Sequence, residues 1–153
     1  MTVRPRTVDA PPPRTRVQAE CDRRGRDAVV DGCVALLSGA DDRDVPLIVV
    51  LGGPAASWAI DPKDGGPVSS RWYWVRVWAA RGLLWAWDER ATSTIVRALD
   101  DPEWRVREMA AKVVARHLVG DALATVTVLR TDPIPRVRAA AHRAVVALTA
   151  AGA

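Results

Sequence analysis

The chain has 153 residues, of which 49% are apolar and 26% charged, and this balance is ordinary for one folded domain. Its two cysteines, Cys21 and Cys33, have no second pair nearby, which excludes a disulfide framework and a zinc site of the Cys-rich type. The first twenty residues lack the apolar core of a signal peptide, and no segment has the composition of a membrane span. We therefore expect a cytoplasmic protein that does not enter the membrane.

The positive charge is concentrated in the second half of the chain. Residues 1–70 hold 9 basic and 10 acidic side chains, whereas residues 71–153 hold 13 basic and 8 acidic ones. The sequence pI near 9.8 indicates an acidic partner, either a protein or a nucleic acid. Only Lys63 and Lys112 are lysines, an arginine bias that GC-rich coding also produces.

The N-terminal part is predicted to contain a tail, two helices and a long loop. Residues 1–20 are rich in arginine and proline, and we expect them to be a disordered tail that precedes one domain over 21–153. Apolar spacing predicts a helix over 24–38 and a shorter one over 44–51, which ends at Gly52-Gly53-Pro54. Residues 52–70 are expected to form a loop that is long for a compact domain.

The strongest signal is an internal repeat of 31 residues. Residues 101–111 align without a gap on residues 132–142, and the same shift backwards reaches residues 75–80. A fixed period of this length indicates a solenoid built from similar helical units. The shared positions are Val75/Val106/Val137, Arg76/Arg107/Arg138, Ala79/Ala110/Ala141 and Leu83/Val114/Val145.

Each shared position has a physical reason. The apolar ones recur at steps of four, which places them on one face of a helix, and the small alanine lets a neighbouring helix approach closely. Asp101 and Asp132 precede prolines, so we expect each to be the N-cap of the second helix in its pair. The first helices are predicted over 91–99 and 121–129.

The pattern Asp-Pro-x-x-Arg-Val-Arg-x-x-Ala-Ala resembles the HEAT repeat, in particular the short form of the phycobilisome-lyase HEAT-like family. The resemblance implies an all-α fold, a right-handed α-solenoid of about three helix pairs. We expect the pairs over 44–87, 91–118 and 121–151, with the helix over 24–38 as an N-terminal cap. The first unit has Ser70 and Arg71 where the others have Asp-Pro.

The shared arginines are predicted to hold the units together. Each could reach the carboxylate of the adjacent unit and form a ladder of ion pairs. We assign this structural ladder to residues on both sides of the unit boundaries: Arg76, Asp101, Arg107, Asp132 and Arg138.

The second helices are expected to line the concave side, and their outward positions predict a binding face. The 31-residue shift brings six cations and two indoles onto it: Trp74, Arg81, Trp85, Arg105, Lys112, Arg116, Arg136 and Arg143. Guanidinium groups pair with carboxylates or phosphates, and indoles stack on rings. Arginines that only solvate the surface are the alternative, and the N-terminal helix could cover Trp74 and Trp85.

No pattern for catalysis, a metal or a cofactor is found. His117 and His142 occupy different repeat positions without the His-Glu pairs of di-iron HEAT-repeat hydroxylases, and His117 is expected to favour a helix C-terminus as an imidazolium. We predict a non-catalytic scaffold that binds a protein through the concave face or the 52–70 loop. The alternative is binding of the DNA backbone, as in HEAT-like DNA glycosylases. Assistance to a chromophore or to a modifying enzyme, as in bilin lyases, ranks third.

Overall fold

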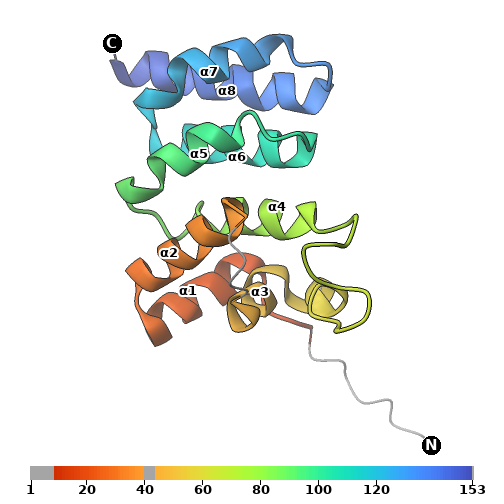
Figure 1. The fold of residues 1–153 in the computed structure, drawn as a ribbon. Coiled ribbons are helices and arrows are strands. Elements are labelled where there is room, and N and C mark those ends of the chain that lie inside the picture. The colour runs from red at the N-terminus through yellow and green to blue at the C-terminus, as the bar shows by residue number, and fades with distance from the viewer. Residues whose placement is uncertain (1–8, 40–43, 153) are drawn as a thin grey trace, which may run out of the picture.

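The computed structural model describes residues 9–39 and 44–152, and every regular element in these ranges is a helix. The α-helices are stacked in layers from the N-terminal part to the C-terminal pair (Figure 1). Four short 3-10 segments, at 53–58, 89–91, 120–122 and 129–131, lie between them. The α-helices are α1 (Pro13–Arg24), α2 (Arg26–Leu37), α3 (Val45–Gly52), α4 (Tyr73–Gly82), α5 (Thr92–Ala98), α6 (Trp104–His117), α7 (Leu123–Val128) and α8 (Pro135–Gly152).

The repeating helices α4, α6 and α8 pack side by side in one row (Figure 1). Val75, Val106 and Val137 are each fully buried, which is what a single apolar face against a neighbouring helix requires. The aligned alanines are buried with them, so the helix axes can approach closely. The predicted all-α, HEAT-like stack is confirmed.

The N-terminal helices are arranged differently from the prediction. Helix α2 packs on α4, as α5 packs on α6 and α7 packs on α8, and it also lies beside α5. Helix α2 is therefore the first helix of the pair whose second helix is α4. Helices α1 and α3 pack against α2 and α4 from the N-terminal side (Figure 1). Residues 44–51 form a helix that packs against α4 as predicted, and the N-terminal end, predicted as one capping helix over 24–38, is formed by α1 and α3 together with α2.

Three glycines allow α3 to sit tightly between α2 and α4. A Cβ built on Gly82 would lie 2.7 Å from Leu51 Cδ2, and one on Gly52 would lie 2.7 Å from the indole of Trp78. A Cβ on Gly32 would lie 2.4 Å from a methyl group of Leu47. A Cβ atom at each position would force its neighbour to move, so the missing Cβ atoms allow these close contacts.

The predicted tail and loop are also more ordered than expected. Residues 13–20, which the prediction placed in a disordered tail, belong to α1, where Val17 is 1% exposed. A proline at the start of this helix loses no backbone hydrogen bond. Residues 1–8 of that tail lie outside the described ranges. In the loop over 52–70, Gly53–Trp58 form a 3-10 helix, and Trp58 packs against Trp78 with ring centroids 5.9 Å apart.

Candidate partner-binding face

The arginine ladder joins successive units through bidentate ion pairs. Arg76 donates from Nε and Nη2 to the carboxylate of Asp101 at 2.9 and 3.0 Å, and Arg107 donates in the same way to Asp132 at 2.9 and 3.2 Å. Two parallel hydrogen bonds of this kind are stronger than a single charged contact. Each pair spans 25 residues and ties one second helix to the turn before the next.

The ladder carboxylates also shape their own turns. Asp101 accepts a hydrogen bond from the amide of Glu103, and Asp132 accepts one from the amide of Ile134. The expected N-cap role is wrong, since α6 begins at Trp104 with Glu103 in the N-cap position. Burial raises the pKa of Asp132, but hydrogen bonds from Arg107 and the Ile134 amide outweigh it and hold the pKa below its usual range.

Two residues of the predicted binding face do not lie on it. Arg81 turns toward the N-terminal end and donates to the carbonyl oxygen of Leu51 at 2.7 Å, where burial lowers its pKa and nearby Arg16 adds to the effect. Its helical position is as predicted, but α3 covers that part of α4. Trp85 follows the end of α4 at Gly82 and lies half-buried in the turn, so the helical spacing does not apply to it.

A buried carboxylate that the prediction did not place in the cationic field lies in its centre. Glu108 on α6 is 7% exposed and pairs with Lys112 on its own helix at 3.0 Å and with Arg136 on α8 at 3.1 Å. Arg105 is paired as well, with Glu103 at 2.8 Å. The repeat positions equivalent to Glu108 hold neither Trp nor Arg, so the alignment of outward-facing cations and rings does not include it. Its spacing of four residues before Lys112 is the sequence feature that predicts the ion pair.

Aromatic rings and guanidinium groups alternate along the N-terminal edge of the second helices. The Cζ atom of Arg105 lies 4.5 Å from the ring centre of Trp104, 5.3 Å from that of Trp74 and 5.7 Å from that of Tyr73. Arg136 continues the row at 5.5 Å from the ring of Trp104. At these distances the ring faces attract the cations. We call these five residues the Arg–ring stack.

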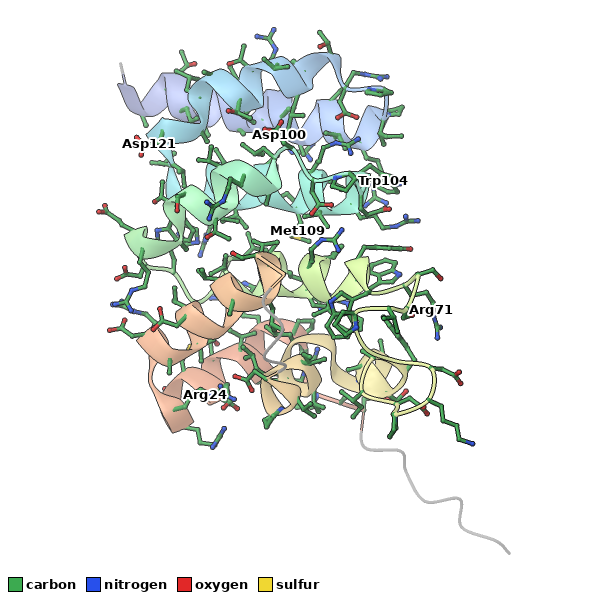
Figure 2. The ribbon with its side chains drawn as sticks, viewed as in Figure 1. Arg24, Arg71, Asp100, Trp104, Met109 and Asp121 are labelled. Atoms are coloured by element: carbon green, nitrogen blue, oxygen red, sulfur yellow. The ribbon has the colours of Figure 1, made fainter. Side chains whose placement is uncertain are left out.

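The second-helix face therefore consists of the Arg–ring stack, the Glu108 pairs and the exposed cations further along α6 and α8. Trp104 lies at the edge of the molecule toward which the loop carrying Arg71 also projects, and Met109 lies on the α4 side of α6 (Figure 2). Beside the stack is an open pocket of about 300 Å³. It is lined by residues of the loop and of the two neighbouring turns: Pro67, Ser69, Ser70, Trp72, Tyr73, Arg76, Pro102 and Glu103.

The opposite edge holds a second cavity, of about 370 Å³, next to the end of α6. The ring of His117 stacks on Trp87 with centroids 4.6 Å apart, and its Nε2 lies 2.7 Å from the carbonyl oxygen of Leu83. Burial lowers the pKa of His117, and Arg116 adds to the effect against the opposing hydrogen bond to Leu83. The lowered pKa favours the neutral ring over the imidazolium that the sequence predicted at this helix end.

This environment makes stability depend on pH. Because the pKa of His117 is lower in the folded than in the unfolded chain, the unfolded state takes up the proton first. The contribution of His117 to the free energy of unfolding is fully present above the pKa of a free histidine, about 6.5, and it is lost as the pH falls below that value. We expect the melting temperature to decrease between about pH 7.5 and 5.5, above the range of most carboxylates, and His117→Gln to flatten that decrease. Exposed His142→Gln is the control; a slope that His117→Gln leaves unchanged would contradict the assignment.

Comparison with known proteins identifies the repeat. The family model described as HEAT repeat matches residues 92–116, which cover α5 and most of α6. No curated protein matches the chain significantly. Among residues 9–39 and 44–152, no helix is both long and apolar enough to cross a bilayer. Residues 92–116 thus form a HEAT repeat, and the packed helices and ion pairs on either side repeat the same arrangement in the neighbouring units.

Proposed function

We propose that the protein is a non-catalytic interaction module that binds a protein partner through its second-helix face. The observation that carries the proposal is the make-up of this face: aromatic rings and arginines around the charge-paired Glu108. Trp, Tyr, Met and Arg are the residues most enriched at protein interfaces and at their energetic centres. HEAT repeats as a class form scaffolds for such interactions, which supports the same conclusion.

The charge of the face favours a partner with acidic groups. Arg105, Lys112, Arg116, Arg136 and Arg143 are accompanied by two carboxylates, Glu103 and Glu108, so the face keeps an excess of three positive charges. Charges at the rim of an interface steer the encounter and select partners more than they add affinity. The two free cysteines support a location in a reducing compartment such as the cytoplasm.

Binding of a DNA backbone remains the second candidate, and the ion pairs make it the weaker one. Phosphate binding needs cations that can exchange small counterions for phosphates. Of the six predicted cations, Arg81 faces a carbonyl group and three are paired with carboxylates. Among the described residues, Arg81, Arg116 and Arg143 have no carboxylate partner within 4.0 Å, and of these three only Arg116 and Arg143 are exposed. Fewer cations are therefore available for DNA phosphates than the six that the sequence predicts.

The test is capture of a partner from the cell of origin, followed by binding measurements with the purified pair. Trp74→Ala and Arg105→Ala are expected to weaken binding by about 2 kcal/mol each, as residues at the centre of an interface do. Arg130→Ala removes an exposed arginine outside this face and serves as the control. The melting temperature of each variant is measured alongside, so that unfolding is not mistaken for lost binding.

A gel-shift experiment decides between the two candidates. If the face bound DNA through phosphates, a duplex would be retarded at about 50 mM salt and released as the salt concentration rises. The alternative would replace the proposal if two results were obtained together. The duplex would be retarded by the wild-type chain but not by Arg116→Glu and Arg143→Glu, and no protein partner would lose binding on Trp74→Ala.

A further inference from the structure

The Arg–ring stack stops at Arg136 although the repeat continues through α8. Tyr73, Trp104 and Pro135 occupy the same repeat position, and the residue after each is Trp74, Arg105 or Arg136. Arg105 has a ring from its own unit and two rings from the unit before. Within residues 9–39 and 44–152, the one ring beside Arg136 is that of Trp104 from the unit before, because Pro135 stands where a ring of its own unit would be.

This difference leaves the guanidinium of Arg136 largely open. The side chain of Arg136 is 69% exposed, whereas that of Arg105 is 36% exposed. Glu108 accepts one hydrogen bond from Nη2 of Arg136 and keeps the group near Trp104. The guanidinium group of Arg136 is therefore held in position, contacts one aromatic ring and has room for a second. A ring supplied from outside would complete the arrangement seen at Arg105.

Arg143 supplies the second element of a recognition site. It lies seven residues after Arg136, on the same side of α8, and is exposed. Seven residues of helix separate the two by about 10 Å, and a peptide in the extended polyproline II conformation covers about 9 Å in three residues and returns every third side chain to the same side. A carboxylate three residues from an aromatic residue would therefore reach Arg143 while the ring lies on Arg136.

We propose that the Arg136 end of the stack binds an extended acidic segment of a partner protein, with an aromatic side chain on Arg136 and a carboxylate three residues away on Arg143. The proposal rests on the proposed function and specifies its partner. Acidic residues fit because the neighbouring cations Lys112 and Arg116 add to the positive potential. The ring fits because Arg136 lacks the one that its repeat position would provide.

The test uses the full chain and a synthetic peptide, acetyl-Ser-Asp-Trp-Ser-Ser-Glu-Ser-amide, observed by NMR. A ring stacked on Arg136 shifts the resonance of its Nε–H proton upfield through the ring current, whereas a hydrogen bond to a carboxylate shifts such a proton downfield. We expect a saturable upfield shift with this peptide and none with the version carrying Leu in place of Trp. The loss of the ring should weaken binding roughly two- to fivefold, the factor that corresponds to an exposed cation–ring contact.

Variants of the protein give the second arm. Arg136→Met removes the observed resonance and should weaken binding of the Trp peptide to the level of the Leu peptide. Arg143→Met should remove the preference for Glu over Gln in the peptide, and Arg130→Met should change neither the shift nor the binding. Equal binding of the Trp and Leu peptides, no shift of the Arg136 resonance up to millimolar peptide, or a larger shift with a ten-nucleotide thymidine strand would each overturn the inference. The effect of Trp74→Ala on binding of the natural partner is measured independently. Failure of the proposed function can therefore be distinguished from failure of this inference.

Discussion

Replacement of Arg107 by Met is expected to lower the free energy of unfolding by about 3 to 5 kcal/mol, the usual cost of removing one member of a buried ion pair. The side chains of Arg107 and Asp132 are 15% and 5% exposed. Methionine keeps much of the volume of the arginine stem but leaves the carboxylate of Asp132 buried without its bidentate partner. The carbonyl groups of Asp101 and Pro102, which Arg107 also binds, lose a donor as well. Urea-induced unfolding measures the change.

Arg138→Met is a matched control in the same chain. Arg138 binds the carbonyl groups of Asp132 and Pro133 at 2.8 and 3.2 Å, as Arg107 binds those of its own unit at 2.9 and 3.2 Å. No carboxylate among the described residues pairs with Arg138, and the residue is exposed. We expect it to cost about 1 kcal/mol or less, the range of an exposed polar contact. Similar losses for the two variants would mean that the ion pair between units contributes little.

Trp78→Ala is expected to destabilise the protein by about 3 to 5 kcal/mol, the range for removal of a buried tryptophan. Trp78 is 6% exposed, and its indole lies against Gly52 and Trp58. Its loss would leave a cavity between α4 and the end of α3, which the backbone around Gly52 cannot fill. The change should therefore also loosen the N-terminal helices α1 and α3, and hydrogen exchange of their amides measures this directly.

Trp74→Ala provides the comparison for that change. Trp74 lies on the same helix but is only half-buried: it packs partly against the core, and its ring also faces the guanidinium of Arg105. We expect it to lose less than half as much stability as Trp78→Ala while reducing partner binding. If Trp74→Ala were equally destabilising, Trp74 would be part of the core, and the second-helix face would lose its main aromatic contact.

The candidate site was predictable where it follows helical position and unpredictable where it depends on what covers a helix. Trp74, Arg105 and Arg136 share one repeat position and do meet at one edge. Arg81 has an equally good position but is drawn to the end of α3. That contact depends on glycines at 52 and 82, which set how closely α3 approaches α4, and no periodicity along the chain reports the distance between two helices.

The amino-acid sequence by itself determined the repeating second helices, their buried face and the ladder of arginine and aspartate, because these follow from a 31-residue period and the 3.6-residue turn of a helix. Only the tertiary structure decided that α2 stands in the row of first helices, that Glu108 lies between Lys112 and Arg136, and that guanidinium groups and rings alternate along one edge. The reason is physical. A helix fixes the direction of each side chain locally, whereas the group that it meets depends on how far apart neighbouring helices lie and on which residues their contacts leave uncovered.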